Sequence, residues 1–85
     1  MSEERLESIL TPYSFRMDGV LVTIWEVLKS RLVDGTVLYH VTVSLGVSKR
    51  FNITVRSWGE LRRKLLVEVS RYKLLRMLGK DEVVR

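Results

Sequence analysis

The sequence predicts an α+β domain in which four antiparallel strands form a meander, with a short N-terminal helix and a long C-terminal helix packed on one face. Two observations carry this prediction. The pairs Asp18-Gly19 and Asp34-Gly35 each separate segments in which apolar and polar residues alternate, a combination typical of β-hairpins. Farther along, Ser57-Trp58-Gly59-Glu60 has the spacing of a helix capping box and opens a stretch of about 20 residues with helical apolar periodicity.

The chain of 85 residues has no repeat, linker or shift in composition, so we expect a single domain spanning residues 1–85. It contains no cysteine, which excludes disulfides and thiolate metal sites. No run approaches the roughly 18 apolar residues of a membrane span, and the polar start is not a signal peptide, so we expect a soluble, cytoplasmic protein. The absence of alanine and glutamine, together with 29% charged residues, indicates a hyperthermophilic source.

The first element is expected to be a helix from Ser2 to Leu10. The Ser2 hydroxyl can cap its first turn, and Pro12 prevents its continuation. Leu6, Ile9 and Leu10 form its apolar stripe. This helix is therefore expected to lie on the core side of the sheet.

The first hairpin follows from alternation in residues 13–17 and from the turn at Asp18-Gly19. Counting outward from a two-residue turn fixes the register. The resulting pairs, all on the core face, are Met17 with Val20, Phe15 with Val22 and Tyr13 with Ile24.

The second hairpin, Val20 to Leu45, has two chemically different faces if Asp34-Gly35 is also a two-residue turn, which pairs Val33 with Thr36. The core face is then expected to hold Val20, Val22, Ile24, Leu28 and Leu32 opposite Val37, Tyr39, Val41, Val43 and Leu45. The outer face is expected to hold Leu21, Thr23, Trp25, Val27, Lys29 and Arg31 opposite Leu38, His40, Thr42 and Ser44. Glu26 falls on the core side, where a salt bridge to Arg62 or Lys73, a position beyond the helix cover, or a subunit interface would each account for it.

A three-residue turn at Gly46-Val47-Ser48 leads into a fourth strand, Lys49 to Val55. Its alternation places Phe51, Ile53 and Val55 in the core. The outer face, which already includes Ser14 and Arg16 from the first strand, gains Arg50, Asn52, Thr54 and Arg56.

The long helix should start at the Ser57 cap and end near Leu78, before Gly79. The stripe that covers the sheet is expected to be Trp58, Leu61, Leu65, Val69, Tyr72 and Leu75 or Arg76. A second flank of the helix holds Val67, Ser70, Leu74 and Met77. We expect this flank to form a homo-oligomer interface in a dimer or tetramer, unless the N-terminal helix covers it within one chain.

Nothing in the sequence indicates an enzyme. His40 is the only histidine and has no nucleophile or carboxylate partner, and the acidic residues are scattered among turns and helix starts. No cluster resembles a metal site and no loop matches a nucleotide-binding motif, so we expect neither metal nor cofactor.

The charge distribution and the outer face together favour nucleic-acid binding. The net charge is +5, and residues 49–76 hold nine Lys/Arg against two Asp/Glu. A basic surface with an aromatic platform suits single-stranded DNA, since exposed bases stack on aromatic rings. The predicted binding residues are Arg16, Trp25, Lys29, Arg31, His40, Arg50, Asn52 and Arg56. Two alternatives are a protein-interaction module, whose outer face is buried in an oligomer through Trp25 and Leu38, and a duplex DNA- or RNA-binding domain.

Three resemblances bear on this choice. Gly46-Val47-Ser48-Lys49-Arg50 is similar to the basic turn of double-stranded-RNA-binding domains, although here it opens a strand rather than a helix. Residues 39–65 resemble the arm-binding domains of tyrosine recombinases. The whole chain, as a small basic protein with four strands backed by helices, resembles the ThermoDBP-related archaeal single-stranded-DNA-binding proteins. That resemblance implies DNA held between subunits by basic and aromatic side chains.

Overall fold

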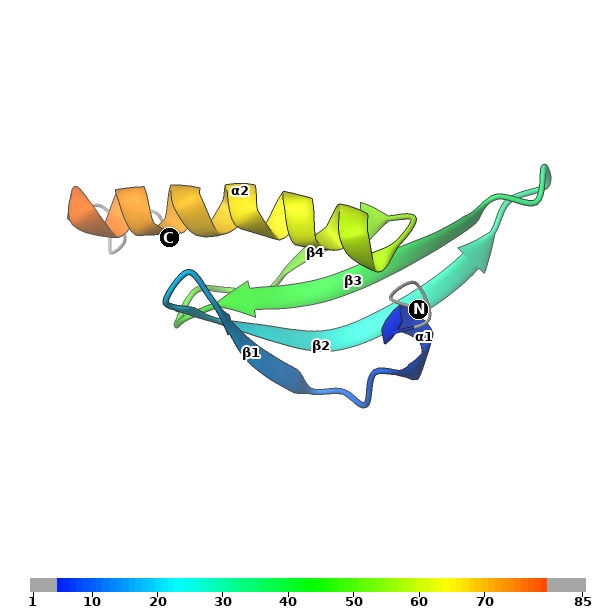
Figure 1. The fold of residues 1–85 in the computed structure, drawn as a ribbon, viewed down its shortest axis with the longest axis horizontal. Coiled ribbons are helices and arrows are strands. Elements are labelled where there is room, and N and C mark those ends of the chain that lie inside the picture. Colours follow the sequence, from blue (N-terminus) through cyan, green and yellow to red (C-terminus); the bar gives the residue numbers. More distant parts are fainter. Residues whose placement is uncertain (1–4, 80–85) are drawn as a thin grey trace.

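In the computed structural model, which describes residues 5–79, four antiparallel strands in the order β1-β2-β3-β4 form one sheet (Figure 1). The strands are β1 (Tyr13–Met17), β2 (Val20–Arg31), β3 (Val37–Leu45) and β4 (Phe51–Val55). The helices are α1 (Arg5–Ser8) and α2 (Trp58–Met77). The predicted α+β meander is confirmed. The described part of the N-terminal helix ends at Ser8 rather than at the expected Leu10, and the expected Ser2 cap lies outside the described residues.

The β1–β2 hairpin has the predicted register, with Met17 opposite Val20 and Tyr13 opposite Ile24. Asp18 and Gly19 both have positive φ, 53° and 83°, as a type I′ turn requires. Because this turn matches the right-handed twist of the strands, two residues suffice and the count from the sequence is correct.

The β2–β3 hairpin differs from the prediction at its turn. The Gly35 amide donates to the Leu32 carbonyl (2.9 Å) and the Leu32 amide donates to the Thr36 carbonyl (2.7 Å), so the loop has three residues, Val33-Asp34-Gly35. Gly35 takes the left-handed position of this loop, with φ 94°. The pairing next to the loop is therefore one residue out of the predicted register.

A β-bulge at Trp25 changes the register a second time. Ile24 pairs with Val43 while Glu26 pairs with Thr42, so Trp25 is an extra residue in β2. The expected faces are correct before the bulge and reversed after it. Leu28 and Leu32, predicted in the core, are 54% and 45% exposed. Glu26 lies exposed on the outer face, so it needs none of the partners considered for a buried carboxylate.

The β3–β4 pairing is the predicted one, with Val43 opposite Phe51 and Val41 opposite Ile53. β4 begins at Phe51 rather than Lys49. Ser57 caps α2 by accepting from the Glu60 amide (3.2 Å), as predicted, but the Glu60 carboxylate accepts from the Arg56 amide (2.8 Å) instead of the Ser57 amide. α2 ends where expected.

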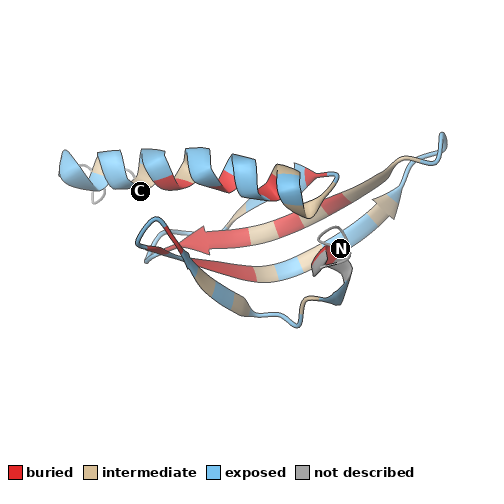
Figure 2. Cartoon of the chain, in the orientation of Figure 1, coloured by how far each residue is buried: buried red, intermediate tan, exposed pale blue. Residues whose placement is uncertain are grey.

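The core lies between the sheet and α2, on one face only, as the red segments of Figure 2 show. Leu61, Leu65 and Val69 of α2 are fully buried against the sheet, and Leu6 of α1 belongs to the same cluster. Leu10, expected beside Leu6, is 89% exposed because the helix ends before it. No helix among residues 5–79 combines the length and the apolarity needed to cross a bilayer.

Beyond the pair of Tyr39 with Val55, the sheet narrows to β2 and β3. We call residues 30–38 the arm. It projects past the start of α2 at the upper right of Figure 1. Arg31 and Asp34 are its only charged residues, so its net charge is zero.

Candidate nucleic-acid interface

The outer face of the sheet, opposite α2, is built from polar side chains that pair across neighbouring strands. These pairs are Ser14 with Thr23 (2.9 Å), Thr42 with Asn52 (2.8 Å), and Trp25 with Ser44 (2.9 Å). They span all four strands. No described helix lies over them, because α1 and α2 pack on the other face.

Trp25 is the centre of this face. Its indole nitrogen donates to the Ser44 hydroxyl, and Ser44 is only 5% exposed although neither α1 nor α2 covers it. The Arg50 guanidinium lies over the indole, with Cζ 3.8 Å from the ring centroid. This distance is typical of a cation–π stack. The guanidinium of Arg50 thus covers this side of the indole.

His40 lies farther along β3 on the same face. Its Nε2 is 3.0 Å from the Ser30 hydroxyl, and its Nδ1 is 3.2 Å from the Thr54 hydroxyl. Both ring nitrogens therefore have a hydroxyl partner on a neighbouring strand, and these two contacts orient the ring. Leu28, brought here by the bulge, lies opposite His40.

The structure brings together five of the eight predicted binding residues on this face: Arg16, Trp25, His40, Arg50 and Asn52. Arg16 lies at the β1 edge and donates to the Gly19 carbonyl (3.4 Å). Arg56 directly follows β4, at the end of the sheet nearest the arm.

Lys29 and Arg31 were predicted on the outer face, and this prediction is wrong. They pair with Tyr39 and Val37, which belong to the core side. The bulge at Trp25 and the three-residue loop cause the reversal together. The outer face is consequently less basic than expected, and it includes the carboxylate of Glu26.

The sequence holds a signal for the bulge that simple alternation overlooks. The apolar spacing in β2 changes from two residues, Val20-Val22-Ile24, to three, Ile24-Val27. A strict alternation puts Glu26 in the core, whereas one extra residue puts Val27 there. The specific stacking of Arg50 on Trp25 has no such signal, since it depends on the β3–β4 register and on a side-chain rotamer.

Two carboxylates, Asp34 in the arm and Glu60 in the first turn of α2, have lowered pKa values. The pKa of Asp34 is lowered mainly because its carboxylate accepts the Thr36 amide hydrogen bond (2.9 Å). The pKa of Glu60 is lowered mainly by the hydrogen bond from the Arg56 amide, with Lys64 adding a positive charge nearby. Each carboxylate thus stabilises a local backbone turn by accepting a hydrogen bond from a backbone amide. Among the described residues, no group of three or more His, Cys, Asp or Glu side chains could hold a metal ion.

The predicted oligomer flank lies on α2 and faces away from the sheet. Val67, Leu74 and Met77 are 57%, 53% and 81% exposed, with exposed Ser70 between them. We call these four residues the α2 outer stripe. α1 does not cover this stripe, because its Leu6 is buried in the core on the opposite side of α2.

Comparison of the chain with protein-family models, with curated proteins and with solved structures finds no match.

Proposed function

We propose that this protein binds single-stranded DNA without catalysis, through the outer face of its sheet. The observation that carries the proposal is the cation–π contact of Arg50 with Trp25, whose indole nitrogen is fixed by its hydrogen bond to Ser44. Guanidinium planes and aromatic rings are the surfaces on which unpaired bases stack in single-strand binders. The expected cytoplasmic location is part of this proposal.

The Arg50 guanidinium has a second use at this site. No hydrogen bond or ion pair within residues 5–79 engages it besides the ring contact. A guanidinium in contact with an indole still has N–H donors, and a phosphate can accept two of them. One residue can therefore offer a stacking plane to a base and a charged edge to the backbone.

Neighbouring amide and hydroxyl groups can recognise a strand without displacing the existing pairs. Asn52 accepts from Thr42 through Oδ1, so its amide nitrogen keeps both hydrogens available. Arg16 adds a positive charge at the β1 edge. These groups are donors, as a phosphate backbone requires.

The shape of the surface favours a single strand over a duplex. A four-stranded sheet is too wide for the major groove, which admits a helix or a two-stranded ribbon. The arm is such a ribbon, but its net charge of zero provides no release of counterions, the main source of affinity for duplex DNA.

The test is a fluorescence titration with an oligothymidylate of about 16 nucleotides, near the upper end of single-strand site sizes. The variant Trp58→Phe leaves Trp25 as the only indole, because the chain has two tryptophans. We expect binding that weakens with salt. In the same background, Trp25→Leu should weaken binding roughly 5- to 150-fold, the equivalent of one base stack, measured by anisotropy of labelled DNA.

Variants of Arg50 separate the contribution of the planar guanidinium group to DNA affinity from that of its positive charge. Arg50→Lys keeps the charge and should weaken binding with an unchanged salt slope, whereas Arg50→Gln should also lower the slope. No binding of wild-type protein to DNA at low salt refutes the proposal. If the protein prefers RNA or duplex DNA to single-stranded DNA, the preferred nucleic acid is the ligand and the single-stranded DNA proposal is wrong.

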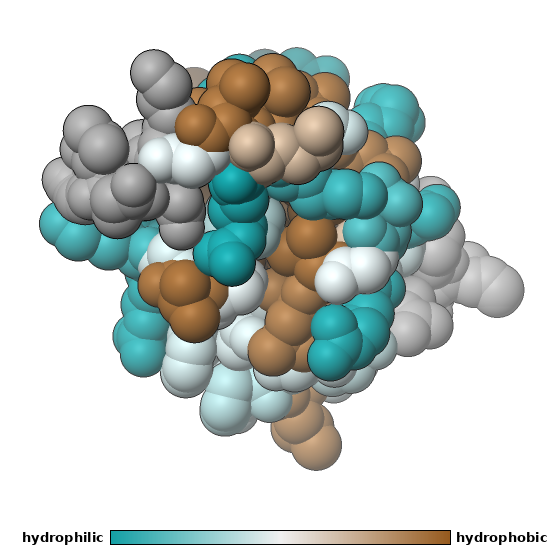
Figure 3. Space-filling model, turned by 90° about the vertical axis from the view of Figure 1, so that its left-hand side faces the viewer, coloured by the Kyte–Doolittle hydropathy of each residue, from teal (hydrophilic) through white to brown (hydrophobic). Residues whose placement is uncertain are grey.

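A second candidate function, self-assembly, rests on the α2 outer stripe. Its residues follow 3-4-3 spacing, which is the seam of a helix-to-helix contact, and three of them are large apolar side chains left in water. Figure 3 shows apolar side chains gathered along the top of the molecule, where α2 lies. We propose that two copies meet along this stripe in a homo-dimer.

Sedimentation velocity tests the assembly. Leu74→Glu places a charge in the middle of the stripe and should shift a dimer to monomer, while Arg62→Glu, an exposed change outside the stripe, should not. A wild-type monomer at high micromolar concentration contradicts the assembly but leaves the DNA proposal intact.

A further inference from the structure

β4 is an edge strand, because the sheet order is β1-β2-β3-β4 and no described strand lies beyond it. Residues along a strand direct their backbone N–H and C=O groups alternately to its two sides. The Lys64 ammonium of α2 donates to the Thr54 carbonyl (3.2 Å), so the backbone of Thr54 faces away from β3. By alternation, the backbone of Asn52 does the same. Within residues 5–79, these two residues therefore present pairing groups that no strand occupies.

A groove of about 360 Å³ lies between this edge and α2. It is lined by Asn52, Ile53 and Thr54 from β4 and by Lys64, Val67 and Glu68 from α2. Ile53 is the middle residue of β4. The groove therefore places the middle of the edge level with the helix turn between Lys64 and Glu68.

The charges on this flank of α2 alternate along the helix. Glu60, Lys64, Glu68 and Arg71 follow steps of four, four and three residues, so they lie on one side of α2. Within the chain, Lys64 pairs with Glu60 (3.7 Å) and Arg71 pairs with Glu68 (3.6 Å), and such exposed pairs exchange partners at little cost. A second copy in the opposite direction puts Glu60 opposite Arg71 and Lys64 opposite Glu68. The flank is thus complementary to itself about an axis midway between Lys64 and Glu68.

The edge of β4 is complementary to itself about the same axis. When Ile53 lies opposite its counterpart in an antiparallel copy, Asn52 of each chain lies opposite the partner's Thr54. These are the residues whose N–H and C=O groups face outward, so they can complete a ladder of hydrogen bonds. Ile53, which is only 8% exposed, stays on the core side of both chains. Backbone and charge, two independent features, therefore indicate one arrangement.

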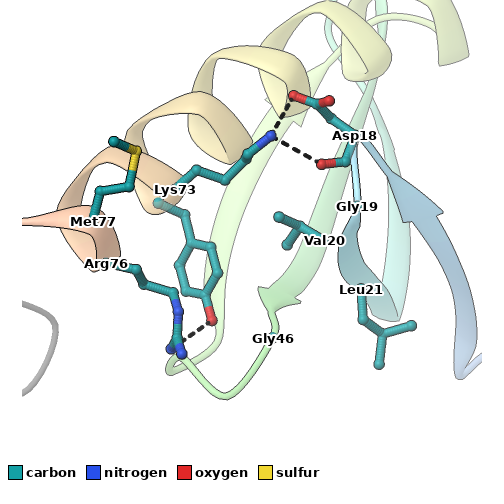
Figure 4. Close-up of a pocket in the computed structure, with 9 residues that line it drawn as sticks. Asp18, Gly19, Val20, Leu21, Gly46, Lys73, Arg76 and Met77 are labelled. Atoms are coloured by element: carbon teal, nitrogen blue, oxygen red, sulfur yellow. Dashed lines mark hydrogen bonds and ion pairs between the residues drawn. The ribbon is translucent and has the colours of Figure 1, made fainter.

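The β1 edge lacks this property. Lys73, on the opposite flank of α2, donates to the Asp18 carboxylate (3.0 Å) in the β1–β2 turn (Figure 4). Arg62 lies about three helical turns earlier on the same flank. Both acids of α2, Glu60 and Glu68, lie on the β4 side. A second copy at the β1 edge would therefore place base opposite base.

Two features keep pairing at the β4 edge weak in the free protein. Lys64 already occupies the Thr54 carbonyl, and lysines commonly protect sheet edges in this way. β4 has only five residues, so the paired strands bury too little surface for a stable interface by themselves. A polyanion that holds two chains side by side adds the missing affinity by raising their effective concentration.

We infer that β4 is the contact through which neighbouring chains pair when they bind the same nucleic-acid strand. The inference rests on the proposed function. Pairing joins two sheets into one, with both outer faces on the same side, so the Trp25 of each chain lies on one continuous surface. Five strand spacings, about 24 Å, separate β2 from its counterpart. Lys64 exchanges the Thr54 carbonyl for the partner's Glu68.

The test is cooperative binding to oligothymidylates of about 16 and about 32 nucleotides, which provide room for one chain and for two. Binding is measured by anisotropy of labelled DNA, and sedimentation velocity counts the chains on each strand. All proteins carry Leu74→Glu, so that assembly through the α2 outer stripe does not contribute. We expect the second chain to bind the longer strand roughly tenfold more tightly than the first, after correction for the number of sites.

Thr54→Pro tests the backbone of the edge. It removes an N–H that faces outward and leaves the β3–β4 ladder intact, as prolines in edge strands do. We expect the tenfold factor to fall to about one. The matched control, Thr54→Val, also loses the hydroxyl contact with His40 but keeps the N–H, so it should retain the factor.

Charge reversal tests the helix flank independently, should Thr54→Pro alter the fold. Glu68→Lys places base opposite base and should abolish the cooperativity, whereas adding Lys64→Glu restores the order of acid and base and should restore it. Equal site affinities on the two strands overturn the edge contact alone. Cooperativity that survives both Thr54→Pro and Glu68→Lys overturns it as well. Absence of binding to either strand overturns the proposed function instead.

Discussion

Gly46, in the β3–β4 turn, packs closely against Tyr72 of α2. A Cβ at this position would overlap the Tyr72 hydroxyl and lie 2.9 Å from Tyr72 Cζ. Its φ of 53° also lies in the left-handed region. We expect Gly46→Ala to destabilise the fold by about 1–3 kcal/mol, measured by urea denaturation. The loss should be smaller in a Tyr72→Phe background, since that change removes the overlapping oxygen. Equal losses in both backgrounds would show that only backbone strain matters.

Glu60 gives stability a dependence on pH. Its pKa is lowered below the ordinary 4.5 because the carboxylate accepts the Arg56 amide, so the folded state favours the ionised form. The contribution is fully present above about pH 4.5 and is lost as the pH falls through the lowered pKa. We expect Glu60→Gln to reduce the melting temperature at pH 7 and to differ little from wild type at pH 2. A difference that persists at pH 2 would show that the cap does not depend on charge. Glu68→Gln, a carboxylate outside the cap, is the control.

At the scale of elements, the sequence predicts the two hairpins unequally. Residues 13–24 could be placed correctly because the Asp18-Gly19 turn leaves no freedom in the count. Residues 25–36 could not be placed correctly for two reasons. Asp34-Gly35 is compatible with a three-residue loop as well as with a two-residue turn, and the only sign of the bulge in the sequence is a change in the spacing of apolar residues. The long helix and its buried stripe could be predicted from helical periodicity, and its start could be predicted from the capping residues. A shift of one residue in the pairing of the strands does not affect either signal.

The same reasoning explains which part of the candidate site could be predicted. Trp25, Arg50 and Asn52 are placed by the first part of β2 and by the β3–β4 turn, where the counts are correct. Lys29 and Arg31 lie past the bulge, so their faces are reversed. The reversed faces are confined to the part of β2 between the bulge and the three-residue loop, and most residues of the candidate site lie outside that part.

The bulge itself gives a prediction for β2. Deleting Trp25 leaves Ile24 opposite Val43 and Glu26 opposite Thr42, which is a continuous ladder with Val27 still in the core. We expect this deletion variant to fold with the circular dichroism spectrum of the wild type and to lose DNA affinity. Deleting Thr23 instead moves Val22 to the outer face and should unfold the chain. A Trp25 deletion that unfolds as well would contradict the register.

At the scale of the whole molecule, α2 covers one side of the sheet (Figure 1). Trp25, Ser44 and Arg50, which we call the Trp25 surface, lie on the other side. A dimer formed through the α2 outer stripe therefore turns its two Trp25 surfaces away from each other. This geometry differs from DNA held between subunits, which the ThermoDBP resemblance implies. Any two strands would bind on separate faces.

We accordingly expect dimerisation and DNA binding to be independent. The monomeric variant Leu74→Glu should bind a short oligonucleotide with the affinity of the wild type, with one strand per chain by isothermal titration calorimetry. A loss of affinity in this variant, with its melting temperature unchanged, would indicate a binding site shared between two chains.

The bulge at Trp25 has a consequence for how this surface can arise. Removing its one extra residue restores regular pairing, so gain or loss of a single codon can add or delete the central aromatic while the core stays the same. If the Trp25 deletion variant folds as expected, the proposed ligand-binding residue is, in evolutionary terms, an insertion that the fold tolerates rather than a position on which the fold depends. Relatives with the same core and a regular β2 would then be expected to lack the Trp25 surface.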